Sequence, residues 1–246
     1  EIGIVNNADA TAITINTAGN VGIGLTPETD WHSSKDALQL GAGASIYGDT
    51  TATGNQISAN ARATVGSTLN GYKYISTDKA STYHQYDGAH NFRVAPSGTA
   101  DAAISWNTAM IINNAGIVTK PLQPAAVAYT MPNHNNGTLV YSIEKFDNAG
   151  NMNITNGRFT CPVAGVYSVS ISGFYDNGRA NNGDVTIRVN NSVYVRATYS
   201  NESQSTYVAI TGVSLVKVAA NDYITIFTEG DMHSNDATVF SVHLVG

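Results

Sequence analysis

The sequence predicts an all-β protein, in which an intertwined, trimeric β shaft and intermediate domain precede a C-terminal antiparallel jelly-roll β-sandwich head. Three observations predict this fold. Helical periodicity is almost absent, strictly alternating segments are frequent after residue 124, and one short strand–turn–strand unit occurs twice. Because such a unit is too small to bury its own apolar face, we expect copies of the chain to complete the core.

The composition narrows the class of partner. Only 12% of the residues are charged, the net charge is -6, and Lys and Arg form no cluster. Nucleic acid and anionic membrane surfaces are disfavoured as partners, since phosphate binding depends on concentrated positive charge. No apolar run reaches the roughly 20 residues that a membrane-spanning helix needs, so we expect no membrane insertion. The chain begins at Glu1 without a methionine, and we expect it to be a fragment or a processed product.

The repeated unit occupies residues 11–21 and 108–118, with identical residues at seven of eleven positions. Each copy is expected to form a short strand, a turn closed by Gly19 or Gly116, and a second short strand. We interpret residues 1–24 as the end of a shaft with a first collar, and residues 108–124 as a second collar and linker. In a trimer, Ile15 and Ile112 are expected to face the shared axis.

Residues 25–107 are predicted to form a β-rich intermediate domain of low hydrophobic density, whose core strands from several chains would share. Residues 35–40 run into Gly41 and are expected to be a strand or a single turn. The other strand candidates are residues 45–47, 56–58, 72–75, 82–86 and 91–94. Six aromatic residues could stack on sugars, but we favour packing between chains: Trp31, Tyr72, Tyr74, Tyr83, Tyr86 and Trp106.

Pro121 and Pro124 break the pattern, because proline fixes φ and removes a backbone donor, and we place the domain boundary there. The head covers residues 125–246. Residues 165–173 alternate strictly, as a half-buried strand does. Residues 185–189 alternate likewise, and Asn190-Asn191 is a two-residue hairpin turn, since asparagine tolerates positive φ. The remaining predicted strands are residues 138–143, 206–218, 223–228 and 238–245, with short pieces near Asn153 and Arg158.

The run Gly-Arg-Phe-Thr-Cys-Pro-Val-Ala-Gly-Val-Tyr at residues 157–167 resembles the signature of the trimeric jelly rolls in complement globular heads and tumour-necrosis-factor-like proteins. Residues 218–224 and 240–244 resemble that family's late turn and closing strand, so the resemblance covers about half the chain. The departures are Cys161, Val169, Asn221 and Ser241. The change at 221 is mild, because asparagine can adopt the left-handed conformation that glycine usually supplies.

A second resemblance concerns the N-terminal half. Residues 15–24 resemble segments that recur in bacteriophage tail fibres, and residues 110–125 resemble the linker before the heads of such fibres. Together the two resemblances imply the distal part of a phage tail fibre, located on the virion and extracellular. They imply a homotrimer that joins upstream fibre or baseplate proteins and binds a bacterial cell-surface receptor.

Strand parity locates candidate receptor-binding residues. If the last strand ends beside the stalk, counting connections backwards places every long polar loop at the free end of the head. Binding residues tend to lie on loops that a rigid scaffold holds, although loops away from a stalk could also simply be unconstrained. The candidates are Asn177, Arg179, Asn182, Asn201, Gln204, Asp231, His233 and Asn235.

Catalytic and metal sites receive little support. Asp231, His233 and Asp236 could bind a metal, but a solvated loop has the same composition, and we expect no metal and no cofactor. Asp176 and Asp184 flank another loop and are expected to serve as turn residues and hydrogen-bond acceptors. No carboxylate pair is specified as a glycosidase requires. Cys161 has no nearby histidine and is predicted to be a buried structural thiol.

Three classes of function remain. The first is a phage fibre adhesin without catalysis. The second is a secreted complement-like or tumour-necrosis-factor-like binding or signalling trimer, which the phage-like repeat and the absence of a Gly-X-Y stalk disfavour. The third is a polysaccharide depolymerase spike, for which we would expect a long right-handed β-helix.

Overall fold

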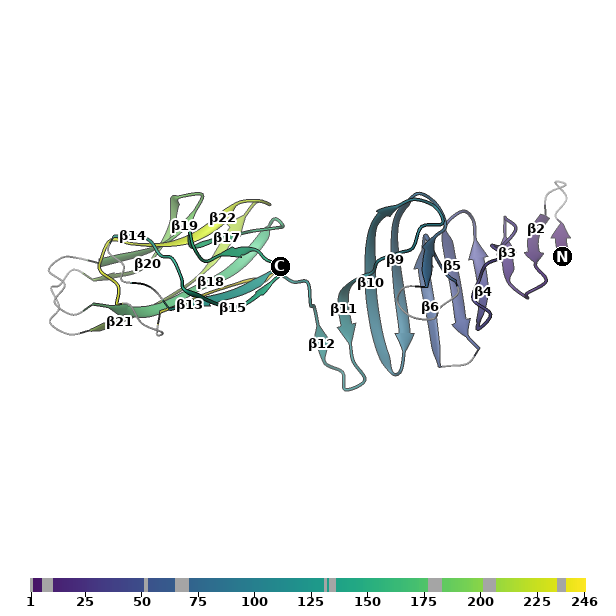
Figure 1. Cartoon of the computed structure of the whole chain (residues 1–246), viewed down its shortest axis with the longest axis horizontal. Helices are drawn as coiled ribbons and strands as arrows, with labels where there is room; N and C mark the ends of the chain where they lie inside the picture. The colour runs from purple at the N-terminus through teal and green to yellow at the C-terminus, as the bar shows by residue number, and fades with distance from the viewer. Residues whose placement is uncertain are drawn as a thin grey trace. The chain divides into compact units, whose positions relative to one another are not determined.

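The computed structural model describes residues 2–5, 11–50, 53–64, 71–130, 132, 136–176, 183–200, 207–233 and 238–246. Throughout these residues the secondary structure is strand, turn and bend without a helix, which confirms the all-β prediction (Figure 1). Among them, no helix is long and apolar enough to cross a membrane. The chain divides into two compact units, Glu1–Pro121 and Leu122–Gly246, which we call the N-terminal and C-terminal units.

The N-terminal unit is built on one ten-stranded sheet, in which nearly all neighbours along the sheet are also neighbours in sequence (Figure 1). All pairs are antiparallel except β3 and β4, which are parallel. The described strands pair within the chain, so the intertwining of copies stays a prediction. In sheet order the strands are β1 Ile2–Val5, β2 Thr11–Ile15, β3 Val21–Ile23, β4 Lys35–Leu40, β5 Ala44–Asp49, β6 Gly54–Ala59, β9 Asp78–Tyr86, β10 Ala89–Gly98, β11 Asn107–Ile112 and β12 Val118–Thr119.

One face of this sheet is covered by the chain itself. The cover consists of the hairpin of β7 (Ala61–Ala63) and β8 (Tyr72–Tyr74) and of residues 99–106. Aromatic rings pack under the cover and within it: the ring centroids of Trp31 and Tyr47 lie 5.1 Å apart, and those of Trp106 and Tyr72, both in the cover, lie 5.9 Å apart. Trp31, Tyr72 and Tyr74 are buried inside one chain, so our expectation that these three pack between chains is wrong; Trp106 is partly buried against the same cluster.

The sheet residues under the cover are largely polar. The Tyr47 hydroxyl donates to Gln56 Oε1 at 3.0 Å, and Gln56 Nε2 donates to the Tyr72 hydroxyl at 2.6 Å. Ser58 and Thr82 are joined by a hydroxyl hydrogen bond of 2.8 Å. These residues can occupy a core because their buried polar groups are hydrogen-bonded to one another.

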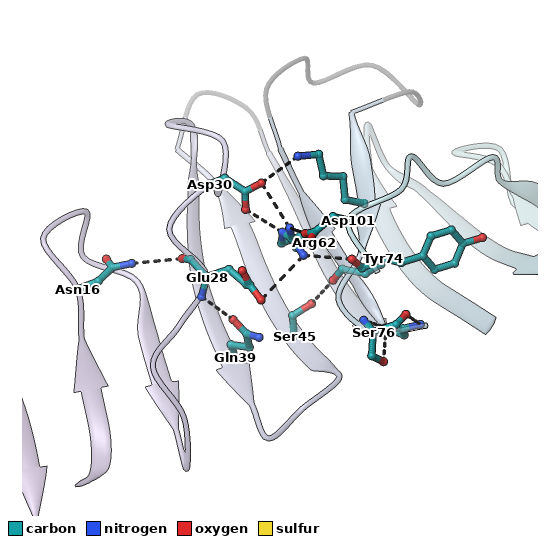
Figure 2. Close-up of polar contacts among 12 residues, drawn as sticks. Asn16, Glu28, Asp30, Gln39, Ser45, Arg62, Tyr74, Ser76 and Asp101 are labelled. Atoms are coloured by element: carbon teal, nitrogen blue, oxygen red, sulfur yellow. Dashed lines mark hydrogen bonds and ion pairs between the residues drawn. The ribbon is translucent and has the colours of Figure 1, made fainter. Parts of the chain in front are cut away.

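Arg62 connects the β7–β8 hairpin to neighbouring segments, and its side chain is 2% exposed (Figure 2). Its Nε donates to Asp30 at 2.8 Å, its Nη1 donates to the Tyr74 carbonyl at 3.1 Å, and its Nη2 pairs with Asp101. Burial alone would raise the pKa of Asp30, but hydrogen bonds and charges from Arg62 and Lys73 outweigh it and hold that pKa below the ordinary carboxyl value.

The two copies of the repeat form the same turn. Asn16 Oδ1 accepts the N–H groups of Ala18 and Asn20, both at 3.0 Å. Asn113 Oδ1 accepts the equivalent N–H groups two and four residues later, at 3.0 and 2.9 Å. Gly19 and Gly116 have φ of 85° and 79°, which explains the glycine in each copy. The predicted strand–turn–strand unit is therefore confirmed, as β2–β3 and β11–β12.

The C-terminal unit is an antiparallel β-sandwich of the jelly-roll type, as predicted (Figure 1). One sheet has the order β15 (Ile143–Asn148), β13 (Ala125–Tyr129), β23 (Val239–Leu244), β18 (Gly165–Tyr175) and β21 (Val208–Val218). The other has the order β16 (Met152–Asn153), β17 (Arg158–Thr160), β22 (Tyr223–Thr228), β19 (Gly183–Val189) and β20 (Ser192–Ser200), with β14 (Gly137–Thr138) beside β22.

The core between these sheets matches the alternation of the sequence. Tyr167, Val169 and Ile171 of β18 are 0–1% exposed. Asn190 and Asn191 close the β19–β20 hairpin with φ of 51° and 67°, which confirms the predicted turn. The predicted strand at residues 138–143 is wrong, because β14 ends at Thr138 and β15, in the other sheet, begins at Ile143. In between, Leu139 and Tyr141 fill the core while the chain crosses.

Cys161 is fully buried between the sheets. Burial, together with the charge of Asp222, raises the pKa of its thiol to about 12, so the thiol is protonated at neutral pH. The prediction of a buried thiol is confirmed.

Candidate functional site

The register of the C-terminal unit defines its two ends. Ala125 lies opposite His243, and Gly165 lies opposite Val218. The linker, the C-terminus, the Asn190–Asn191 turn and the β21–β22 turn thus share one end, which we call the linker end. At the opposite end, which we call the far end, β18, β20 and β22 end and β19, β21 and β23 begin (Figure 1).

These strand ends agree with the strand-parity prediction, whereas residues 177–182, 201–206 and 234–237 of the three connections lie outside the described residues. A fourth connection, between β13 and β14, also belongs to the far end, because the Thr130 N–H donates to the Thr238 carbonyl. Sequence reasoning missed it, although the composition of residues 130–137, rich in Asn, Pro and Gly, marks a loop.

Of the predicted receptor-binding residues, the structure describes Asp231 and His233. The others lie outside the described residues: Asn177, Arg179, Asn182, Asn201, Gln204 and Asn235. Asp231 and His233 are held against the end of β18, where the Asp176 N–H donates to the Asp231 carbonyl and the His233 N–H donates to the Phe174 carbonyl, both at 2.9 Å.

Met232 anchors residues 231–233 to the core of the sandwich through its side chain. It is 1% exposed and forms an isolated β-bridge with Tyr175. Because side chains alternate along an extended segment, burying Met232 turns Asp231 and His233 outward. Asp231 is exposed and His233 is partly exposed.

His233 forms the centre of a polar and aromatic cluster at the far end. Its Nδ1 lies 3.5 Å from Asp176 Oδ1, and its ring lies 4.4 Å from the ring of Tyr207, tilted by 48°. Tyr207 is 49% exposed. A carboxylate, an imidazole and an accessible phenol ring together offer acceptors, donors and a stacking face to a polar ligand.

Asp184 corrects an expectation. It lies within β19, is 6% exposed, and pairs with Arg196 Nε at 2.8 Å. It is therefore a buried ion-pair partner rather than a turn residue. The paired Arg196 is 59% exposed in its side chain, and its guanidinium lies 5.0 Å from the ring centre of Tyr199. Arg196 and Tyr199 add a positive charge and a second aromatic ring near this end. Sequence reasoning missed both residues, because the alternation of β20 was the only signal for them.

The weak metal candidates Asp231 and His233 have no third ligand in the described part of the chain, where no group of three His, Cys, Asp or Glu side chains could hold a metal ion. Asp236 lies outside the described residues.

In the described part of the N-terminal unit, Tyr86 is an exposed aromatic ring among polar groups. Tyr86 is 48% exposed and stacks on His84 with ring centres 5.5 Å apart. It borders a hollow of about 450 Å³ that Asn55, Gln85 and His90 also line. Of the six aromatic residues considered for sugar stacking, Tyr86 is the most accessible.

No protein-family model matches the sequence, and no curated protein sequence matches it. Solved structures similar to the chain include the globular domain of zebrafish complement 1qA protein, with 16% identity and a TM-score of 0.43, covering 50% of this chain and 98% of that one. Murine APRIL at pH 5.0 is similar over 50% of this chain and 99% of that one, with 8% identity and a TM-score of 0.42. At these identities and TM-scores, the likenesses carry no argument about what this chain binds.

Proposed function

We propose that the chain is a structural and adhesive protein of a bacteriophage tail fibre, a homotrimer whose C-terminal unit binds a receptor on the host-cell surface without catalysis. The observation that carries the proposal is the separation of the two ends of the sandwich. The linker, the C-terminus and two tight turns lie at the linker end, and the strands that flank the long polar connections end and begin at the far end. A sandwich tethered at one end and carrying loops at the other suits contact with a surface.

The polar and aromatic character of the far end supports a glycan or outer-membrane receptor. His233, Asp176 and Tyr207 combine hydrogen-bonding groups with an accessible ring, and several weak contacts of this kind gain strength when one rigid assembly presents them together. The likeness of residues 15–24 to tail-fibre segments supports a place on the virion, in contact with upstream fibre or baseplate proteins.

The outer face of the five-stranded sheet supports self-association. Val213 and Leu215 of β21 are 68% and 62% exposed, and Ile143 and Phe146 at the opposite edge are 41% and 46% exposed. Large apolar side chains at both edges of one face are a feature of association surfaces. Light scattering tests the trimer: a mass near the 25.8 kDa of one chain would contradict it.

Cell binding tests the far end. The labelled full chain is titrated onto a panel of bacterial strains, and the variant Asp231→Ala/His233→Ala is compared on a strain that binds. Removing two outward polar groups at the far end should weaken binding by about tenfold or more, about 1.4 kcal/mol or more.

Lys217→Ala is the control for this experiment, because Lys217 is an exposed charged residue at the linker end. The control should bind normally, and both variants should keep the mass and circular dichroism of the parent. Undiminished binding by the double variant would move the receptor site away from this loop. Release of reducing ends from host polysaccharide would contradict the absence of catalysis.

A further inference from the structure

The ten-stranded sheet of the N-terminal unit has an unusual distribution of polarity between its faces. An antiparallel sheet with one covered face normally buries apolar side chains and exposes polar ones. Here the face beneath the β7–β8 hairpin buries Gln39, Ser45, Gln56, Ser58 and Thr82, each no more than 5% exposed. The alternating side chains point to the opposite face, which we call the open face.

The open face carries a continuous apolar row that crosses eight strands. Residues paired directly across neighbouring strands lie on the same face, so the ladder register identifies the row. Its members, from β2 to β11, are Ile15, Val21, Leu38, Ile46, Ile57, Tyr83, Phe92 and Met110.

A second row runs beside the first. It contains Ile13, Ile23, Leu40, Ala44, Ala59, Ser81 and Val94. Within the two rows, Ile57 is 55% exposed, Val94 46%, Ile23 43% and Ile46 41%. Ile57, Tyr83, Phe92 and Val94 border a hollow of about 480 Å³, large enough to receive side chains from another surface.

Among the residues that the structure describes, charge is nearly absent from the open face. Alternation assigns Asp36 and Lys79 to it, and both lie outside the two apolar rows, on opposite margins. A further row, which includes Asn55, Gln85 and His90, gives one margin a polar border. An apolar centre with polar margins is the usual anatomy of a protein–protein interface.

We infer that the open face is the surface through which the N-terminal units of three copies of this chain pack together. This inference rests on the homotrimer proposed above and assigns its contact in the N-terminal unit to named residues. With neighbouring strands about 4.8 Å apart, eight strands make a strip about 34 Å long. A matching partner must be long, apolar and nearly uncharged, and a second copy of the same sheet has these properties.

The repeat supports this choice of occupant. The first copy contributes Ile15 at one end of the row, and the second contributes Met110 at the other, with Ile112 on the same face. Both predicted axis residues, Ile15 and Ile112, therefore lie on the open face. The apolar row thus begins in one copy of the repeat and ends in the other. The same row on a second copy of the chain has the same length and the same two ends.

Cysteine cross-linking of the full chain tests the inference. The only native cysteine, Cys161, is buried and protonated. We therefore expect the reagent to modify an introduced, exposed thiol and to leave Cys161 unmodified. The test variant is Ile57→Cys, at the middle of the row. The control is Ser105→Cys, a nearly isosteric change at an exposed residue of the segment that covers the other face.

Treatment with a short bis-maleimide should convert most of the Ile57→Cys protein into covalently linked chains. The linked fraction should be independent of protein concentration, whereas Ser105→Cys should stay single. A trimeric mass with no cross-link at residue 57 would overturn the inference but not the homotrimer. A single-chain mass would overturn both. If Ile57→Cys is poorly folded by circular dichroism, Ile46→Cys in the same row replaces it, with the same outcomes.

Discussion

Arg62 joins three parts of the N-terminal unit: the segment carrying Asp30, strand β8 through the Tyr74 carbonyl, and the loop carrying Asp101. Arg62 is buried, but Asp30 and Asp101 are 40% and 74% exposed in their side chains, so both carboxylates can regain contact with water when Arg62 is removed. We therefore expect Arg62→Met to lower the free energy of unfolding of this unit by about 1 to 3 kcal/mol, mainly through the unpaired Tyr74 carbonyl and the lost charge-assisted hydrogen bonds.

Urea denaturation measures this effect. The matched control is Lys73→Met, which removes the other cation that contacts Asp30 but from a side chain that is 38% exposed. An exposed ion pair contributes little, so the control should lose less than about 1 kcal/mol. Equal losses in the two variants would show that Arg62 does not fasten the hairpin.

His84 predicts a pH dependence for the same unit. Burial, followed by the charges of Arg93 and Lys35, lowers the pKa of His84 to about 4 in the folded chain, while Asp49 opposes the shift. The unfolded chain takes up a proton near pH 6.5, before the folded chain does. The stability contributed by neutral His84 is therefore complete above about pH 6.5 and decreases as the pH falls toward 4.

His84→Phe keeps a ring beside Tyr86 but removes the titration. Urea midpoints of the N-terminal unit, measured from pH 7.5 to 4.5, should fall less steeply in this variant than in the parent. His243→Gln, an exposed change in the other unit, should leave the slope unchanged. A slope that His84→Phe does not alter would assign the pH dependence to other groups.

At the scale of elements, the two repeat turns predict a pair of matched effects. Asn113→Ala removes the acceptor for two backbone N–H groups and should open the β11–β12 turn, whereas Asn113→Asp keeps the acceptor. Hydrogen exchange at Ala115 and Ile117 should accelerate about tenfold in the alanine variant, corresponding to about one net hydrogen bond.

Asn16→Ala should have the same effect at Ala18 and Asn20, because its side chain accepts the equivalent N–H groups. Asn16 also donates to the Glu28 carbonyl at 3.4 Å, so the loss in that turn should be at least as large. Unchanged exchange in either alanine variant would show that the glycine, rather than the asparagine, determines the turn.

The elements also show where sequence patterns predict the fold. Residues 165–173 are predictable because one side of β18 faces the core and the other does not, so Tyr167, Val169 and Ile171 alternate with serines. The structure of residues 138–143 is not predictable in this way, because the chain leaves one sheet and enters the other while its side chains stay in the core. A local sequence pattern indicates which residues are buried, but it does not indicate to which of the two sheets they belong.

In the N-terminal unit, the alternation of side chains does not predict which face of the sheet is buried. In Ser45-Ile46-Tyr47 and Gln56-Ile57-Ser58, the usual assumption directs the isoleucines inward. The structure instead buries the polar neighbours and leaves Ile46 and Ile57 on the open face. Alternation thus located the strands but could not tell which side the chain itself covers.

At the scale of the whole molecule, the far end was predictable from strand counting alone, because antiparallel connections must alternate between the two ends of a sandwich. Its chemistry was only partly predictable. Arg196 and the burial of Asp184 depend on pairing between β19 and β20 and on the packing around them, which residue type does not reveal.

Two compact units with separate cores should unfold separately. Calorimetry at one protein concentration should resolve two transitions, with Arg62→Met lowering one of them. Phe159→Ala, which empties a fully buried site between the sheets, should lower the other by about 3 to 5 kcal/mol. A single transition that both variants lower equally would mean that the units unfold cooperatively.

The position of Gly246 has a practical consequence. The last strand returns to the linker end, where the Val166 N–H donates to the Gly246 carbonyl. A biotin or a fluorescent label joined to the C-terminus would therefore be anchored on the side of the sandwich away from the long loops. Immobilised through that handle on a sensor surface, the protein would offer those loops to the solution, and a screen of surface polysaccharides would need no redesign of the sandwich.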